Sequence, residues 1–165
     1  MSQFLLPDEI IDLARRVVEE NRAAGRKVAV AESCTGGLVA AAITEIAGSS
    51  AVLDRAFVTY SNEAKREALG VAGDVIDAFG AVSIACVYAM AQGALEHSNA
   101  DVAVAISGIA GPDGGTEQKP VGTVVFARAT RDAEEREAES KLFLGCNRSE
   151  VRRQATLCAL ELLLP

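Results

Sequence analysis

Apolar and polar positions recur along the chain with two distinct spacings. From Pro7 to about Ala24 the apolar residues repeat at helical spacing, with Pro7 suited to a first turn and Gly25 to the stop. The run K27-V-A-V-A31 that follows is apolar almost throughout, which is typical of a buried strand. The pattern therefore predicts a helix that leads directly into a strand.

The same two spacings continue to the C-terminus. Helical periodicity predicts further helices over 35–46, 62–69, 82–97 and about 149–163. Ser83 is the expected N-cap of the helix over 82–97. Strand patterns cover the remaining apolar stretches, 55–61, 101–107, 121–130 and 137–144. A charged turn at 131–136 joins the last two of these strands.

Helices that alternate with about five strands predict an α/β fold. We expect a three-layer α/β/α sandwich with a mixed, mostly parallel sheet, in which the last two strands are antiparallel. The chain has 165 residues and no repeat, linker or low-complexity segment, so we expect a single domain over 1–165.

Charge and composition narrow the classes of function. The formal net charge is −7, which argues against nucleic acid as a partner. The four cysteines form no C-x-x-C pair and there is one histidine, so we expect no metal site. The N-terminal stretch lacks a signal-peptide pattern, and no run approaches the roughly 18 apolar residues of a membrane span. A reduced, cytoplasmic protein without membrane contact is the expectation.

Three polar clusters follow predicted strands: E32-S-C-T-G-G37, T59-Y-S-N62 with Lys65 one turn later, and S107-G-I-A-G-P-D-G-G115. In open α/β sheets, ligands bind beyond the carboxyl ends of the strands. If the three strands are parallel, the clusters converge at one edge of the sheet and form one site.

The first cluster contains three adjacent nucleophile candidates, Ser33, Cys34 and Thr35. Side chains alternate along an extended segment, so a Ser33 that faces the cleft leaves Cys34 facing the core. The N–H groups around Gly36 and Gly37 can face the oxygen of a ligand. The alternative is that Ser33 or Thr35 merely caps the following helix.

A serine nucleophile needs a base. The only histidine, His97, falls at the end of a predicted helix, where it suits the helix dipole better than a Ser–His–Asp arrangement. Lysine is the other common partner of serine. Lys65 lies in the cluster that we expect beside Ser33.

Five segments together resemble a known family: E32-S-C-T-G-G37, Y60-S-N-E-A-K65, G80-A-V-S83, S107-G-I-A-G-P-D-G-G115 and K119-P-V-G-T-V124. They are similar, in the same order and over nearly the whole chain, to the C-terminal domain of the CinA family, the nicotinamide-nucleotide amidohydrolases. Larger members carry an additional N-terminal molybdopterin-binding-like domain, and this chain resembles the stand-alone form.

The resemblance implies hydrolysis of the carboxamide of nicotinamide mononucleotide to nicotinate mononucleotide and ammonia, in pyridine nucleotide salvage, without a metal or cofactor. It implies a Ser33–Lys65 pair with Tyr60 nearby, and a phosphate-binding arginine that best matches Arg148, with Arg152 as the alternative. Ser107 stands where the family more often has threonine. The implied substrate-binding residues are Thr35, Gly36, Gly37, Asn62, Ser107, Gly108, Gly111 and Arg148.

In the implied reaction, Ser33 attacks the carboxamide while neutral Lys65 removes its proton, and Tyr60 and Ser107 orient the pair. Two other functions stay open: a non-catalytic nucleotide-binding or protein-interaction module linked to competence or DNA damage, and another pyridine amide nucleotide as substrate. The Ala-rich stretch V39-A-A-A-I43 suits packing within the fold as well as a homo-oligomer contact.

Overall fold

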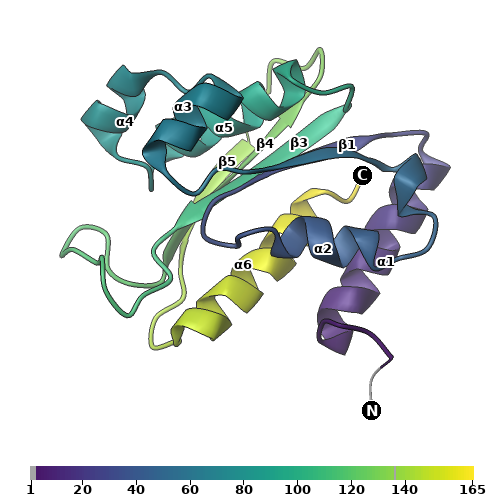
Figure 1. Cartoon of the computed structure of the whole chain (residues 1–165), viewed down its shortest axis with the longest axis horizontal. Helices are drawn as coiled ribbons and strands as arrows, with labels where there is room; N and C mark the ends of the chain where they lie inside the picture. The colour runs from purple at the N-terminus through teal and green to yellow at the C-terminus, as the bar shows by residue number, and fades with distance from the viewer. Residues whose placement is uncertain (1–2, 136) are drawn as a thin grey trace.

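The computed structural model describes residues 3–135 and 137–165. Helices and strands alternate along the chain in three layers, with the sheet in the middle (Figure 1). In chain order the elements are α1 (Asp8–Ala23), β1 (Val28–Glu32), α2 (Leu38–Thr44), the 3-10 turn η1 (Ser49–Ala51), β2 (Leu53–Val58), α3 (Asn62–Leu69), α4 (Gly73–Phe79), α5 (Ile84–Glu96), β3 (Val102–Gly108), β4 (Thr123–Thr130), β5 (Glu137–Leu142) and α6 (Arg148–Leu162).

The sheet has five strands in the order β2-β1-β3-β4-β5. β1 pairs in parallel with both β2 and β3, whereas β4 is antiparallel to β3 and β5 is antiparallel to β4. The mixed, mostly parallel sheet and its antiparallel end are therefore confirmed. Because β1, β2 and β3 run in the same direction, their carboxyl ends lie at one edge.

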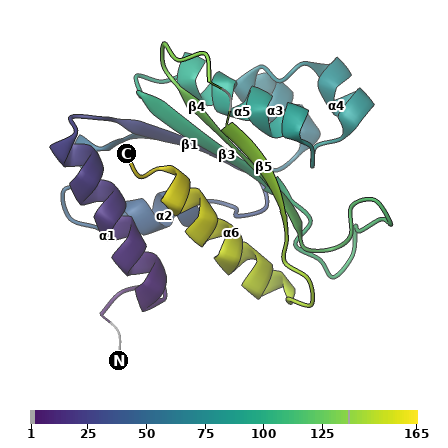
Figure 2. The same cartoon turned by 180° about the vertical axis from the view of Figure 1, so that it is seen from behind.

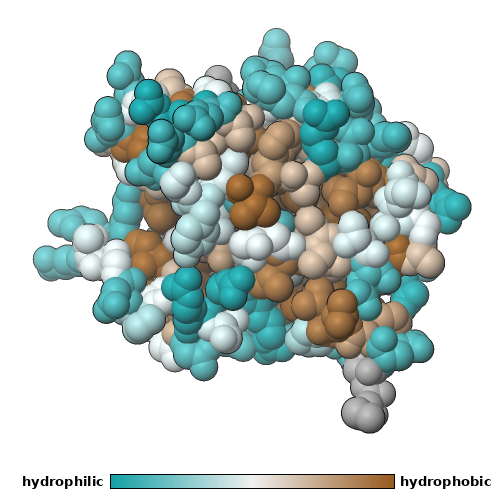
Figure 3. All heavy atoms as spheres, viewed as in Figure 1, coloured by the Kyte–Doolittle hydropathy of each residue, from teal (hydrophilic) through white to brown (hydrophobic). Residues whose placement is uncertain are grey.

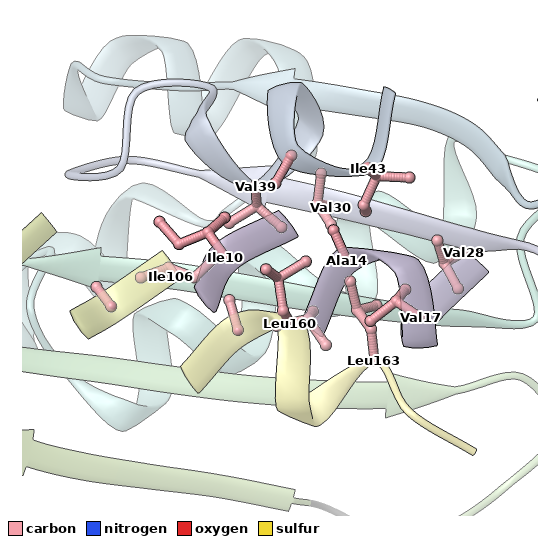
Figure 4. Close-up of a cluster of buried hydrophobic side chains, with 14 of the residues drawn as sticks. Ile10, Ala14, Val17, Val28, Val30, Val39, Ile43, Ile106, Leu160 and Leu163 are labelled. Atoms are coloured by element: carbon pink, nitrogen blue, oxygen red, sulfur yellow. The ribbon is translucent and has the colours of Figure 1, made fainter. Parts of the chain in front are cut away.

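Each face of the sheet is covered by three helices: α1, α2 and α6 on one side, and α3, α4 and α5 on the other (Figure 2). The strand residues alternate between the two faces. Val28, Val30 and Ile106 pack with α1, α2 and α6 (Figure 4), whereas Ala29 and Ala31 pack with α5. Small alanines on the second face let α5 lie close to the sheet, and this face carries the buried Lys65 described below.

The boundaries depart from the sequence pattern near the polar clusters. The second helix begins at Leu38 rather than at residue 35, because Gly36 and Gly37 both have positive φ angles and form a turn instead. β2 ends at Val58, so residues 59–61 form a loop. The sequence pattern did not predict α4, whose single buried residue is Ile76. Residue 136, at the end of the predicted turn 131–136, lies outside the described residues.

The carboxyl ends of the parallel strands face the left side of Figure 1, where α3 lies above, the loop 109–122 to the left and the start of α6 below. Hydrophilic residues predominate over α3 and α4 on this face, whereas hydrophobic residues show between the layers (Figure 3). None of the helices in the described ranges is long and apolar enough to cross a membrane.

Candidate active site

A pocket of about 280 Å³ opens at this edge of the sheet. It is bordered by all three polar clusters, by the loop before α5 and by the first residue of α6, Arg148. Its lining residues are Ser33, Cys34, Tyr60, Asn62, Lys65, Ala81, Val82, Ser107, Gly108, Ile109, Ala110, Gly111, Asp113, Gly114 and Arg148. The convergence expected from parallel strands is what the fold shows.

Ser33 and Lys65 are in direct contact in this pocket. The Nζ atom of Lys65 donates a hydrogen bond to Oγ of Ser33 at 3.0 Å. Ser33 follows β1 and is held at the sheet edge by its own N–H, which donates to the carbonyl of Ile106 on β3. Lys65 reaches it from the second turn of α3, whose N-terminus is capped by the hydroxyl of Ser61.

Lys65 is among the largest fully buried side chains, with 1 % of its surface exposed. Its Nζ also donates to the backbone carbonyls of Thr59 at 2.9 Å and Tyr60 at 3.2 Å. No carboxylate lies within salt-bridge distance of it in the described part of the chain. Burial without a countercharge lowers the pKa of Lys65 below that of a free lysine.

The turn that carries Ser33 is fixed by a residue that the sequence pattern did not single out. Glu32 is fully buried, and its two carboxylate oxygens accept hydrogen bonds from the N–H groups of Val39 and Ala40 at 2.9 and 3.1 Å. The carboxylate thus satisfies the free amides at the start of α2. The N-cap residue is Gly37 and has no side-chain cap, so the alternative that Ser33 or Thr35 caps this helix is wrong.

Cys34 lies beside the nucleophile candidate but belongs to the hydrophobic core between the sheet and α1, α2 and α6. It is 5 % exposed, and burial raises the pKa of its thiol to about 11. A thiol in this state is protonated near neutral pH and is a poor nucleophile.

Tyr60 contributes its backbone rather than its ring to the Ser33–Lys65 contact. Its carbonyl accepts from Lys65, whereas its hydroxyl accepts a hydrogen bond from Nη2 of Arg148 at 3.1 Å. Tyr60 as a whole is 62 % exposed and lines the pocket. The hydroxyl is thus directed to the arginine, and the expected orientation of the pair comes from the carbonyl instead.

The two candidate arginines, one turn apart on α6, have different surroundings. Arg148 lines the pocket, and its Nη1 donates to the carbonyl of Gly111 at 2.6 Å. Arg152 does not line the pocket; its guanidinium donates to the carbonyls of Cys34 and Thr35 at 3.0 and 3.3 Å. Only Arg148 is therefore placed to meet a ligand in the pocket.

Most of the residues expected at the site come together in this pocket. They include Asn62 at the start of α3, Ser107 and Gly108 at the end of β3, and Gly111 in the loop that follows. Thr35, Gly36 and Gly37 do not line the pocket. The N–H of Gly36 closes a turn on the carbonyl of Ser33. Residues of two loops border the pocket without having been singled out individually, although they belong to recognised motifs: Ala81, Val82, Ile109, Ala110, Asp113 and Gly114.

No group of three or more His, Cys, Asp or Glu side chains in the described ranges is arranged to hold a metal ion. The polar groups that line the pocket include the Ser33 hydroxyl, the buried Lys65 amine and the Arg148 guanidinium.

Comparison with known proteins gives a consistent result. The family model of the CinA C-terminal domain matches residues 10–165. The nicotinamide-nucleotide amidohydrolase PncC of Escherichia coli K12 is 54% identical over 155 residues, which cover 94% of this chain and 93% of that protein. A CinA-like protein of Mycobacterium marinum is 49% identical over 94% of this chain but only 35% of its own length.

Solved structures share the whole fold. The competence/damage inducible protein CihA from Agrobacterium tumefaciens has a TM-score of 0.93 and 48% identity, covering 99% of this chain and 97% of that one. A CinA superfamily protein from Klebsiella pneumoniae has a TM-score of 0.87 and 41% identity, covering 93% of this chain and 94% of that one. Family match, sequence identity and fold agree, and the chain belongs to the CinA C-terminal domain family.

Proposed function

We propose that this chain is an amidohydrolase that converts nicotinamide mononucleotide to nicotinate mononucleotide and ammonia. The observation that carries the proposal is the 3.0 Å contact between Ser33 and a buried Lys65 that has no countercharge. The name of the PncC relatives, nicotinamide-nucleotide amidohydrolase, supports the substrate class. We place the reaction in cytoplasmic pyridine nucleotide salvage, carried by residues 1–165 as a single domain.

The three acceptors around Lys65 explain how it can act as a base. A charged lysine has three N–H donors, which match Ser33, Thr59 and Tyr60. A neutral amine has two N–H donors, which stay with the two carbonyls, and a lone pair that is left for the hydroxyl proton of Ser33. The lowered pKa of Lys65 favours this neutral form.

In the first step, Oγ of Ser33 bonds to the carboxamide carbon while its proton passes to Nζ of Lys65. The carbonyl oxygen gains negative charge in the tetrahedral intermediate. We assign its stabilisation to backbone N–H groups of the loop 33–37, each worth about 3 kcal/mol. The N–H groups of Thr35 and Gly37 have no acceptor among the described residues, whereas that of Gly36 is engaged by Ser33.

In the second step, the carbon–nitrogen bond breaks and Lys65 returns its proton to the departing nitrogen, which leaves as ammonia. The nicotinoyl group then remains as an ester on Ser33. Water attacks this ester with neutral Lys65 again as the base, which releases the carboxylate and restores the Ser33 hydroxyl. One lysine thus serves as base, acid and base again.

The other end of the pocket suits the nucleotide. Within the described residues, the guanidinium of Arg148 donates to two neutral acceptors, the carbonyl of Gly111 and the hydroxyl of Tyr60, and to no carboxylate. A phosphate would replace these with charge-assisted hydrogen bonds, which are roughly twice as strong as neutral ones. Asn62 and Ser107 also line the pocket and offer further polar contacts to the nucleotide.

The proposal is tested by incubating the purified protein with nicotinamide mononucleotide and separating the products by chromatography. Nicotinate mononucleotide and ammonia in equal amounts are expected. Free nicotinamide and ribose phosphate would show cleavage of the glycosidic bond instead, and no conversion by a folded protein would leave a binding module as the better account.

A further inference from the structure

Arg152 connects the C-terminal helix to the turn that carries Ser33. Its Nε donates to the carbonyl of Cys34 and its Nη2 to the carbonyl of Thr35, across 118 and 117 positions of sequence. In the described part of the chain it has no carboxylate within salt-bridge distance. Its neighbour Arg153, by contrast, pairs with Glu150 and Glu9. The guanidinium of Arg152 is therefore committed to these two backbone oxygens.

These two hydrogen bonds fix the orientation of two peptide planes. In a trans peptide the C=O and the following N–H point in opposite directions. A Cys34 carbonyl held toward α6 therefore turns the N–H of Thr35 away from α6. A Thr35 carbonyl held the same way turns the N–H of Gly36 inward, where it closes the turn on the carbonyl of Ser33.

The result is a buried residue with unpaired polar groups two positions after Ser33. Thr35 is fully buried, yet its hydroxyl has no hydrogen-bond partner in the described ranges and neither does its N–H. Unpaired buried amides are rare in folded proteins and call for a reason. The two carbonyl contacts of Arg152 supply such a reason, because they hold this peptide in place although its N–H has no partner.

Gly36 completes this arrangement. Its φ is +60°, and a Cβ atom built on it would lie 3.3 Å from Nη2 of Arg152. The glycine thus leaves room for the guanidinium while it adopts a backbone conformation that other residues avoid. The position of Arg152 therefore accounts for a glycine at residue 36, and no contact between Gly36 and the substrate is needed to explain it.

We propose that Arg152 is a positioning residue: it holds the turn 33–36 so that the Ser33 hydroxyl faces the bound carboxamide. This inference rests on the proposed amidohydrolase function. It divides two arginines of one helix between two tasks, because Arg148 meets the nucleotide whereas Arg152 touches only the protein. This division of tasks predicts that loss of Arg152 lowers kcat, whereas loss of Arg148 raises KM.

The test compares Arg152→Ala, Arg148→Ala and Arg153→Ala in steady-state ammonia release from nicotinamide mononucleotide. For Arg152→Ala we expect kcat to fall by about 10- to 100-fold with KM within about two-fold of wild type. For Arg148→Ala we expect KM to rise about 10-fold or more through loss of the phosphate contact. Arg153→Ala removes the same charge from the same helix and should leave both constants within about two-fold.

Binding is measured separately by titration calorimetry on the Ser33→Ala background, where turnover is absent. Adding Arg152→Ala should leave the Kd for nicotinamide mononucleotide unchanged, whereas adding Arg148→Ala should raise it. If Arg152→Ala does not fold, Arg152→Lys carries the same test, because a lysine keeps the charge but replaces the planar guanidinium, whose Nε and Nη2 reach the two carbonyls separately, with a single Nζ.

A raised KM or Kd with normal kcat in the Arg152 variants would overturn the inference and make Arg152 a substrate ligand. Kinetics like those of Arg153→Ala would overturn it as well. Both results require an active wild type, so they are distinct from failure of the proposed function. A folded wild type that releases no ammonia would remove that function and the positioning role with it.

Discussion

The side chains of Ser33 and Lys65 meet at 3.0 Å although 32 positions separate them. β1 brings the serine to the edge of the sheet, and α3 brings the lysine over the same edge. The lysine is buried and so shielded from water, and no carboxylate among the described residues lies close enough to stabilise its charged form. The fold thus places a hydroxyl beside an amine whose charged form is disfavoured.

This environment predicts how the rate depends on pH. Burial lowers the pKa of Lys65, and only its neutral form can accept the serine proton. We expect kcat/KM to rise with pH as Lys65 loses its proton and then to level off, with a midpoint below the ordinary lysine value of about 10.4. The measurement is ammonia release from pH 5 to 10 in buffers of constant ionic strength. A rate that falls over this range would contradict the role of Lys65 as base.

Replacement of Lys65 by methionine should separate activity from stability. The variant keeps the apolar volume and removes the base, so we expect kcat to fall by about 10²- to 10⁴-fold. Removal of the buried charge favours the fold, whereas loss of the hydrogen bonds to Ser33, Thr59 and Tyr60 opposes it, so the melting temperature should stay close to that of the wild type.

The pH dependence of that stability difference has a definite sign. Because the folded-state pKa of Lys65 is lowered, the unfolded chain binds the proton more tightly, and the cost of burying the charge is complete below the folded pKa. The cost disappears as pH rises toward about 10.4. The melting temperature of Lys65→Met relative to wild type should therefore be most favourable at low pH. A gap that widens with rising pH would contradict this linkage.

Gly36→Ala and Gly25→Ala form a matched pair. Both glycines have positive φ, +60° and +66°, so alanine costs roughly 1–2 kcal/mol at either position. A Cβ at Gly25 meets nothing within 4 Å, whereas at Gly36 it approaches the guanidinium of Arg152. We expect both variants to melt at a lower temperature and only Gly36→Ala to lose kcat. Equal activities would show that the turn tolerates displacement of the arginine.

Glu32→Gln should destabilise the protein although the change removes only a charge. The carboxylate accepts two backbone N–H groups, and an amide oxygen with its NH2 group can accept only one of them. One buried N–H is left unpaired at a cost of about 1–3 kcal/mol. Each kcal/mol corresponds to about 2–4 °C in melting temperature for a chain of this size. The exposed Glu19→Gln serves as the control, and a Glu32 variant as stable as that control would contradict this role.

Much of the fold could be predicted because the strands are simple. The continuous apolar runs around Val30 and Val104 are typical of central strands covered on both faces, and both are buried along their length. The short helix α4 gave no usable signal, because it buries only Ile76 and has no second turn of apolar residues to repeat the spacing. The start of α2 was misplaced because two consecutive glycines favour a turn.

Within the site, the sequence indicated the residues whose chemistry is local and missed those that act across the fold. Ser33 directly follows a recognisable strand and Lys65 lies within a recognisable short helix. Because the only histidine falls at the end of another helix, lysine was the predicted base. Glu32 resembles a strand residue until α2 folds back over it. Arg152 was expected only as the alternative phosphate-binding arginine, because its contacts with residues 34–35 exist only once α6 packs beside them. Such contacts depend on tertiary packing, which no local pattern records.

The most direct test of the account is ammonia release from nicotinamide mononucleotide by Ser33→Ala and Cys34→Ala beside the wild type. Both changes are small, and circular dichroism and thermal melting are to be used to check that each variant is folded. The account predicts that Cys34→Ala keeps turnover, because the buried thiol has a pKa raised to about 11, and that Ser33→Ala loses it. A folded Ser33→Ala that still releases ammonia, or a folded Cys34→Ala that does not, would contradict Ser33 as the nucleophile.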